Sequence, residues 1–130
     1  GPQTPEALQQ PINELERQED SDGVWRTYVN EASAGDYADL YARLDALVAL
    51  QAPSFDCVYG WRLLQEQKMI ARLVLEGRDT SQAQTPAQIE RFISHYQRLT
   101  EHALATMPTQ ADWLLELNAQ HGFKSLRGPQ

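Results

Sequence analysis

The sequence lacks the features that several common classes of protein require. Among its 130 residues there is a single cysteine, Cys57, so no internal disulfide can form. Its apolar runs, such as residues 44–50, are far shorter than the roughly 20 residues that span a bilayer. Basic residues are also few, because 11 Lys and Arg face 18 Asp and Glu, for a formal charge of −7. These deficits argue against nucleic acid and membrane as partners and make the cytoplasm the expected compartment.

The sequence also lacks a glycine-rich phosphate loop. Neither G-x-x-x-x-G-K-[ST] nor G-x-G-x-x-G occurs, and neither of the two lysines, Lys68 and Lys124, lies in a glycine-rich stretch. Residues 18–23 resemble the start of a calcium-binding EF-hand loop, but the twelfth position, which needs glutamate, is Val29. We therefore expect neither a metal site nor a nucleotide cradle within these residues.

The histidines do not form a predicted metal site either. His95 and His102 are seven residues apart and share a helix face, whereas two ligands on one helix usually stand four apart. Arg91 and Arg98 lie beside them. We interpret these four side chains as a mildly basic, solvated helix face.

Capping signals and periodicity predict a mostly helical chain. Thr4-Pro5 and Thr85-Pro86 each place a capping hydroxyl before a proline at the first helical position, and Gln88 completes a capping box at the second. Apolar residues at three-and-four spacing then give a core face that continues to Pro108. The elements we expect are helices over residues 5–10, 11–20, 24–34, 36–44, 55–75 and 86–107, a strand within 45–53, and two strands around a turn at 118–122.

This order of elements suits part of an α/β layer fold better than a helical bundle. The length allows a single domain over residues 1–130, or a domain fragment, but not two domains. A sheet of two or three short strands has few neighbours, which favours the fragment.

A polar cluster lies in the stretch VYGWRLLQEQKMIAR, residues 58–72. On a helix, Arg62, Gln65, Glu66 and Met69 fall on one side. Arg62 and Glu66 can pair at i and i+4, which on an exposed surface contributes only about 0.2–0.5 kcal/mol, so one interpretation is a solvated face. In the other, Arg62 binds two oxygens of a phosphate through its planar guanidinium, and Glu66 holds the guanidinium in place. The residues alone leave both interpretations open.

Five segments together resemble one family. VYGWRLLQE, residues 58–66, is similar to the W-R-x-x-Q-E signature of the D-glycerate 3-kinase-like group of P-loop kinases, which are relatives of pantothenate kinase, uridine kinase and phosphoribulokinase. Four further segments resemble the same family in the same order, and they are residues 11–30, 37–55, 85–104 and 111–121. The resemblance covers nearly the whole chain but only the C-terminal part of the family's architecture.

The resemblance implies an activity and a set of site residues. An intact protein of this family would use ATP and Mg²⁺ to phosphorylate a hydroxyl of D-glycerate or a similar small acid. Arg62 would approach the transferring phosphate, with Glu66 as its partner. Arg26 would meet the substrate carboxylate, and the weaker substrate-binding candidates are Asn13, Asn30 and Gln65. For Arg26 and Asn30 the alternative is a structural network.

The resemblance also implies that more chain is needed for catalysis. The family's phosphate-binding loop and catalytic acid belong to an N-terminal portion, and we expect these 130 residues to be inactive without it. One alternative is a P-loop kinase for another small molecule, such as a nucleoside or pantothenate. Another is a stand-alone helical module that kept the kinase-like fold, binds a partner and forms a homo-oligomer.

Overall fold

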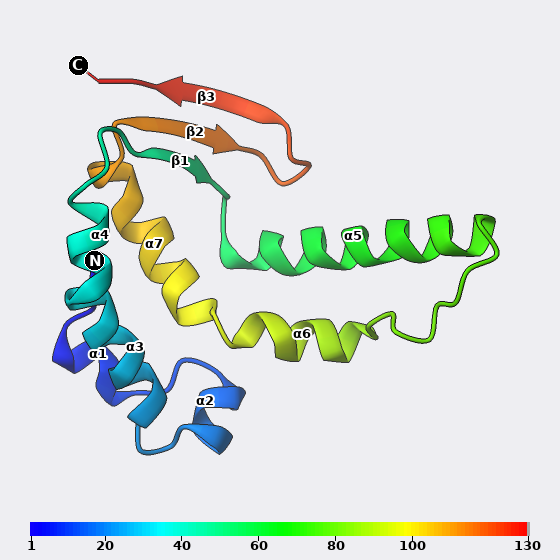
Figure 1. The fold of residues 1–130 in the computed structure, drawn as a ribbon, viewed down its shortest axis with the longest axis horizontal. Coiled ribbons are helices and arrows are strands. Elements are labelled where there is room, and N and C mark those ends of the chain that lie inside the picture. The colour runs from blue at the N-terminus through cyan, green and yellow to red at the C-terminus, as the bar shows by residue number, and fades with distance from the viewer. Residues whose placement is uncertain (130) are drawn as a thin grey trace.

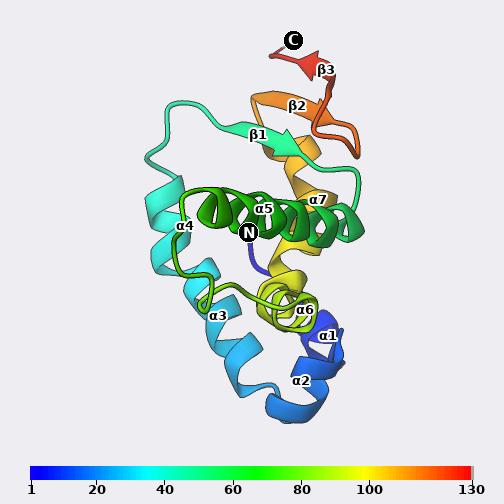
Figure 2. The same ribbon diagram turned by 90° about the vertical axis from the view of Figure 1, so that its right-hand side faces the viewer.

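The computed structural model, which describes residues 1–129, has one small sheet at one end, and the helices lie on one side of it (Figures 1 and 2). Helices α1–α4 gather on one side, and the long α5 extends to the other side with α6 beside it (Figures 1 and 2). The elements are α1 (Pro5–Gln9), α2 (Glu14–Glu19), α3 (Val24–Ala34), α4 (Asp36–Tyr41), β1 (Val48–Gln51), α5 (Phe55–Leu75), α6 (Pro86–Ser94), α7 (Gln97–Gln110), β2 (Trp113–Leu117) and β3 (Phe123–Arg127). The predicted fold class, mostly helical with a few short strands, is confirmed.

The sheet has the strand order β1-β2-β3 and mixes two kinds of pairing. β1 runs parallel to β2, with Val48 opposite Trp113, and β2 runs antiparallel to β3, with Leu115 opposite Leu126. Helices α5, α6 and α7 lie in the chain between the two parallel strands, as a parallel connection requires. The turn between β2 and β3 is held by Asn118, whose side-chain oxygen accepts hydrogen bonds from the amides of Gln120 and Gly122 at 3.0 and 2.7 Å. The three predicted strands are therefore present.

Helix α5 has the bounds that its flanking residues predict. Ser54 precedes its first turn, and Gly77 follows its last residues with φ of 65°, a conformation that glycine adopts at low cost. The amides of Gly77 and Arg78 donate to the carbonyls of Val74 and Leu73, a Schellman arrangement that satisfies two free carbonyls of the helix end.

The prediction of a single helix over residues 86–107 is wrong, because the helix is interrupted at His95 and Tyr96, which separate α6 from α7. The break frees the carbonyl of Ser94, which instead accepts a hydrogen bond from Asn13 Nδ2 at 2.9 Å. Pro108 was expected to end the helix but lies inside α7. Proline has no amide to donate to Leu104, and the side chain of Gln51 supplies the missing donor at 3.0 Å from the Leu104 carbonyl.

Two other expected helices are shorter than predicted. Helix α2 begins at Glu14 rather than at Pro11, because Asn13 caps it by accepting the amide of Glu16. Helix α4 ends at Tyr41, and Leu44 lies outside it.

Few apolar side chains are fully buried, and the expected core is only partly present. The buried apolar residues are Ile89, Ile93, Ala111 and Leu114. Phe92 and Leu99, placed on the predicted core face, are 45% and 43% exposed, and Trp25 on α3 is 68% exposed. Within residues 1–129, three charged residues are buried instead: Arg26, Glu66 and Arg98. The centre of the helical region is therefore built as much from ion pairs as from apolar packing.

Candidate functional site

The polar cluster on α5 is an ordered network. Arg62 donates from Nη1 to Glu66 Oε2 at 2.7 Å and from Nη2 to the side-chain oxygen of Gln84 at 2.8 Å. Gln84, in the loop before α6, donates its own amide to Glu66 Oε1 at 2.7 Å. The predicted pairing of Arg62 with Glu66 is therefore present, and it is tied to a segment 18 residues away that the helical pattern did not indicate.

Glu66 is the anchor of this network. Its side chain is 4% exposed, whereas that of Arg62 is 26% exposed. The amide of Gln84 and the guanidinium of Arg62 both stabilise the carboxylate, and they lower the pKa of Glu66 below its usual value despite burial. Glu66 is thus ionised at neutral pH and fixes the orientation of a guanidinium that still reaches solvent.

The cluster borders an open hollow of about 460 Å³ on the solvent side of α5. It is lined by Arg62, Gln65, Glu66, Lys68, Met69 and Arg72. Three of these side chains are cationic and one is acidic, which gives this surface a local positive charge on a chain whose net charge is −7. Such a surface can bind a phosphate or another anion. Gln65 lies on this surface as predicted, exposed and beside Arg62 and Glu66.

A second hollow, of about 450 Å³, lies at the carboxyl ends of the parallel strands β1 and β2. Its lining includes Gln51 at the end of β1, Pro53 just after it, Asn118 in the β2–β3 turn and Lys124 in β3. Trp61 on α5 secures this turn, because its Nε1 donates to the Ala119 carbonyl at 2.6 Å. Ligands of open α/β sheets bind outside the carboxyl ends of parallel strands, and α5 begins at this end. The contact between Trp61 and the turn was not predicted.

Arg26 and Asn30, the predicted substrate-binding residues of α3, hold the N-terminal helices together. The guanidinium of Arg26 donates to the Leu8 carbonyl at 2.7 Å and to Asp20. Asn30 pairs through both side-chain atoms with the backbone of Gln3, accepting its amide at 2.6 Å and donating to its carbonyl at 3.0 Å. The structural network given as the alternative is thus present, and substrate binding by these residues stays a prediction.

Asp20 and Gly23 explain how Arg26 is held. Burial raises the pKa of the Asp20 carboxyl, but hydrogen bonds from the amides of Trp25 and Arg26 and the charge of Arg26 outweigh it, so the pKa is lowered. Gly23 has φ of 72°, and a Cβ there would lie 3.0 Å from the Arg26 guanidinium. The turn before α3 therefore needs glycine both for its backbone and for the packed arginine.

Arg98 is the residue whose position the sequence interpretation missed. It was assigned to a solvated face, but it is 7% exposed. Its guanidinium donates to both Glu16 oxygens at 2.8 and 2.7 Å and to the carbonyls of Ala7 and Gln10. Asn13 reaches the same junction, where it donates to Ser94 and Gln97. Arg98 and Asn13 thus join α7 to α1 and α2.

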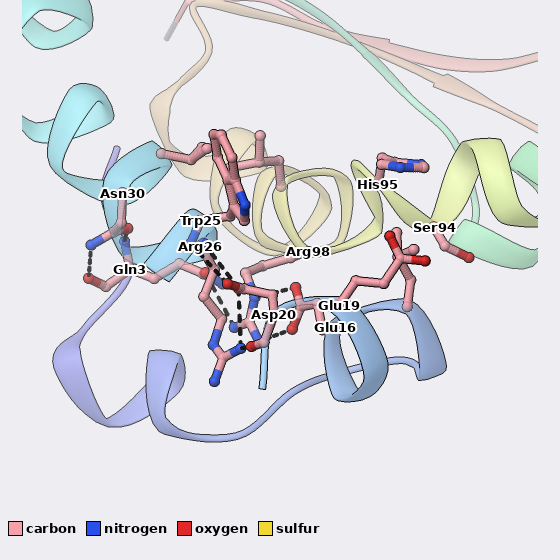
Figure 3. A pocket seen from close by; sticks show the side chains of 13 residues that line it. Gln3, Glu16, Glu19, Asp20, Trp25, Arg26, Asn30, Ser94, His95 and Arg98 are labelled. Carbon is pink, nitrogen blue, oxygen red and sulfur yellow. Dashed lines mark hydrogen bonds and ion pairs between the residues drawn. The ribbon is translucent and has the colours of Figure 1, made fainter. Parts of the chain in front are cut away.

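These ion pairs line a hollow of about 350 Å³ between α2, α3 and α7 (Figure 3). Figure 3 shows Arg26, Asp20, Arg98 and Glu16 gathered along one side of it. The guanidinium of Arg26 makes its hydrogen bonds through Nε and Nη1. This hollow and the one on α5 share no lining residue, so the structure does not bring Arg26 and Arg62 together in one cavity.

Two negative findings concern residues 1–129. No group of three or more His, Cys, Asp or Glu side chains there could hold a metal ion. None of the helices in this range has the length and apolarity needed to cross a membrane.

Comparison with known proteins finds a weak sequence relative and similar solved structures. No family model matches the sequence. An uncharacterized kinase of Schizosaccharomyces pombe, mug58, is 32% identical over 69 residues, which are 53% of this chain and 22% of that protein. The D-glycerate 3-kinase of Cryptococcus neoformans superposes on 98% of this chain and 45% of its own, with a TM-score of 0.67 and 19% identity.

The YGR205w protein superposes on 98% of this chain and 43% of its own, with a TM-score of 0.57 and 15% identity. The chain therefore shares the fold of part of each of these two proteins, one of which is a D-glycerate 3-kinase. It spans less than half the length of both solved structures and about a fifth of the curated relative. At identities below 20%, the structural likeness establishes this fold and not the reaction.

Proposed function

We propose that this chain is the C-terminal portion of an ATP-dependent kinase that phosphorylates a hydroxyl of a small acid such as D-glycerate. The observation that carries the proposal is the ordered Arg62–Glu66–Gln84 network on the helix that follows β1 in a P-loop kinase fold. The likeness to a D-glycerate 3-kinase and to the kinase mug58 supports the choice of reaction and acceptor.

In this proposal Arg62 stabilises the charge that develops on the transferring phosphoryl group. Phosphoryl transfer is catalysed mainly by positioning and by electrostatic stabilisation, and a preformed guanidinium costs no reorganisation when the reaction occurs. Glu66 and Gln84 restrict the guanidinium to one orientation, while its exposed fraction leaves it accessible to an anion. Lys68 and Arg72 add positive charge along the same helix face.

In the same proposal, Arg26 binds the carboxylate of the acceptor. Arg26 lines a hollow with room for a molecule as small as glycerate. Asn30 and Asn13 support this hollow by fixing the ends of α1 and α2. Arg26 and Arg62 line separate hollows.

ATP and Mg²⁺ need more than these residues supply. The basic face of α5 fits phosphate oxygens, but residues 1–129 contain neither a phosphate loop nor a group of three or more His, Cys, Asp or Glu side chains that could hold the metal. We therefore propose that a nucleotide-binding portion of the same protein holds MgATP, and that the protein acts in the cytoplasm. ATP supplies the phosphoryl group, and the residues described here position the acceptor and stabilise charge.

The experiment has two parts. The first is to read the coding sequence ahead of Gly1, which should contain a G-x-x-x-x-G-K-[ST] segment in frame. The second is ADP release from MgATP by the full-length protein, measured separately with D-glycerate, L-glycerate, pantothenate and uridine. D-Glycerate should give the highest kcat/KM, and these 130 residues alone should give no turnover. A preference for pantothenate or uridine would support the kinase activity but show that the acceptor is not D-glycerate.

A second candidate function is favoured by exposed aromatic and aliphatic side chains. Large apolar residues on α3 and α4 are more than half exposed, among them Val24, Trp25, Tyr28, Leu40 and Tyr41. A stand-alone module could cover them by forming a homo-oligomer. Static light scattering of this chain, together with the kinase assay of the full-length protein, distinguishes the kinase from the stand-alone module. A stable oligomer of this chain combined with no kinase activity of the full-length protein would favour the module.

A further inference from the structure

Glu66 divides its two carboxylate oxygens between two partners. Its Oε2 accepts from Arg62 Nη1 at 2.7 Å, while its Oε1 accepts the backbone amide of Gln84 at 2.7 Å. Arginine and carboxylate frequently pair through two parallel hydrogen bonds, but here only one oxygen of Glu66 bonds to the guanidinium. Nη2 of Arg62 donates instead to the side-chain oxygen of Gln84 at 2.8 Å. One donor of the guanidinium is therefore bonded to a neutral amide oxygen rather than to a charged one.

A phosphate oxygen is a stronger partner for this donor than the amide oxygen of Gln84. The amide carries no net charge, so the Coulomb attraction that it exerts on a guanidinium is smaller than that of a phosphate. A phosphate also offers several oxygens to the planar fork of donors. The side chain of Arg62 is 26% exposed, so an anion arriving from solvent can reach it. The hydrogen bond to Gln84 is thus the contact of Arg62 that an anion replaces most easily.

The side chain of Gln84 can leave Arg62 while its backbone stays in place. The Gln84 amide remains bonded to Glu66, and Thr85, the next residue, is fixed as the cap of α6 by its capping box with Gln88. Just before Gln84, the amide of Ala83 donates to the Thr80 carbonyl at 3.0 Å. Release of Arg62 therefore needs only rotation about the side-chain bonds of Gln84, without movement of the loop.

Two hollows provide space for this exchange. Arg62 lines the hollow on α5, and Gln84 lines another, of about 380 Å³, whose lining also includes Gln88 and Phe92 of α6. The two helices lie side by side, joined by the loop that carries Gln84 (Figure 1). The bond between Arg62 and Gln84 thus connects the lining of one hollow to that of the other. The first hollow has room for an incoming anion, and the second has room for the displaced side chain.

We infer that the side chain of Gln84 holds the place of a phosphate oxygen on Arg62, and that the transferring phosphoryl group displaces it. The inference rests on the proposed function, which brings that group to Arg62. It adds where the group binds, which is at Nη2, on the side of the loop before α6. Before the nucleotide binds, Gln84 keeps the guanidinium aligned. Afterwards Glu66, still bonded to the Gln84 amide, keeps it aligned, and a nucleotide without the terminal phosphoryl group leaves Gln84 in place.

Binding of two nucleotides to variants of the full-length protein tests this exchange. The probes are ADP and a non-hydrolysable ATP analogue with an imido group between the β- and γ-phosphorus atoms, each with Mg²⁺, and the Kd values are measured by isothermal titration calorimetry. Gln84→Glu puts a charged oxygen on Arg62 that a phosphate displaces with difficulty. It should raise the Kd of the analogue by about tenfold or more and leave that of ADP within about twofold.

Gln84→Met should have the opposite effect on the analogue. Methionine has a similar length but lacks the competing oxygen, and the backbone amide that holds Glu66 is retained. The Kd of the analogue should fall by about threefold or more, because no contact has to be broken before the anion binds. A role of Gln84 in stability alone would not give Gln84→Met and Gln84→Glu opposite signs, nor would it separate the analogue from ADP.

The matched control is Gln82→Glu, which makes the same change of charge at an exposed glutamine of the same loop. Salt screens such a surface charge, so both Kd values should stay within about twofold of the unchanged protein. If Gln82→Glu weakened analogue binding as much as Gln84→Glu, the effect would be one of general charge, and the inference would be wrong.

Two further outcomes separate this inference from the proposed function. Weaker analogue binding in Gln84→Met would overturn the inference, because Gln84 would then support Arg62 in the bound state instead of giving way; turnover of D-glycerate by the unchanged protein would still support the function. Opposite effects of Gln84→Glu and Gln84→Met on analogue binding, without turnover on any acceptor, would support the exchange and reject the proposed reaction.

Discussion

Replacing Arg98 with methionine should destabilise the chain more than the loss of any exposed ion pair. Methionine keeps much of the volume but removes four short hydrogen bonds, two to Glu16 and two to backbone carbonyls. The side chains of Arg98 and Glu16 are 7% and 13% exposed, so the Glu16 carboxylate would remain buried without its partner. Breaking a buried pair in this way costs about 3–5 kcal/mol, a large part of the roughly 5–15 kcal/mol that stabilises a typical domain.

Urea unfolding followed by tryptophan fluorescence measures this loss. The control is Arg91→Met, which removes an ion pair to Glu19 whose side chains are 56% and 50% exposed and should cost less than about 1 kcal/mol. The double variant Arg98→Leu with Glu16→Leu should lose less than Arg98→Met, because neither charge is then left unpaired. If Arg98→Met cost no more than Arg91→Met, the interpretation of Arg98 as the junction of α7 with α1 and α2 would be refuted.

Three further predictions concern stability. Burial raises the pKa of Glu16, but hydrogen bonds from Arg98 and the Ile12 amide outweigh it, and the pKa of Glu66 is lowered as well. Both carboxyls thus stabilise the fold at pH values above their ordinary pKa, near 4.5, and this stabilisation is lost as the pH falls through their lowered pKa values. A urea midpoint that does not change between pH 7 and pH 2 would count against this prediction. Thr85→Ala removes the hydroxyl of the capping box and should lower the free energy of unfolding by about 1 kcal/mol, as measured by urea titration. Gly77→Ala should destabilise the fold by about 1 kcal/mol because φ at Gly77 is positive, whereas Gly60→Ala within α5 should stabilise it by about 0.5–1 kcal/mol. If thermal melts showed that both variants shift the melting temperature in the same direction, the helix-end geometry would be contradicted.

The parts of the fold that depend on neighbouring residues could be predicted. Helix α5 follows from Ser54 and Gly77, and α6 begins at a capping box visible in the sequence. The pairing of Arg62 with Glu66 follows from their spacing of four residues. These features are local, so periodicity and capping contain the needed information.

The parts that failed depend on residues far apart in the chain. The break between α6 and α7 is stabilised by Asn13, 81 residues before Ser94, and Pro108 is tolerated because Gln51 lies beside Leu104. Arg98 occupies a polar position of a helical pattern, which cannot show that the position is buried against Glu16. The contact of Gln84 with Glu66 could not be predicted for the same reason, because only the tertiary structure brings the loop of Gln84 to α5.

The kcat of Arg62→Ala in the full-length protein tests the central claim most directly. The control is Arg78→Ala, which removes an arginine whose side chain is 65% exposed and pairs with Glu76. If Arg62 stabilises charge on the transferring phosphoryl group, its removal should lower kcat by about 100-fold or more, while Arg78→Ala stays within about twofold of the unchanged protein. An unchanged kcat for Arg62→Ala would contradict the account and leave the α5 cluster with a structural role only.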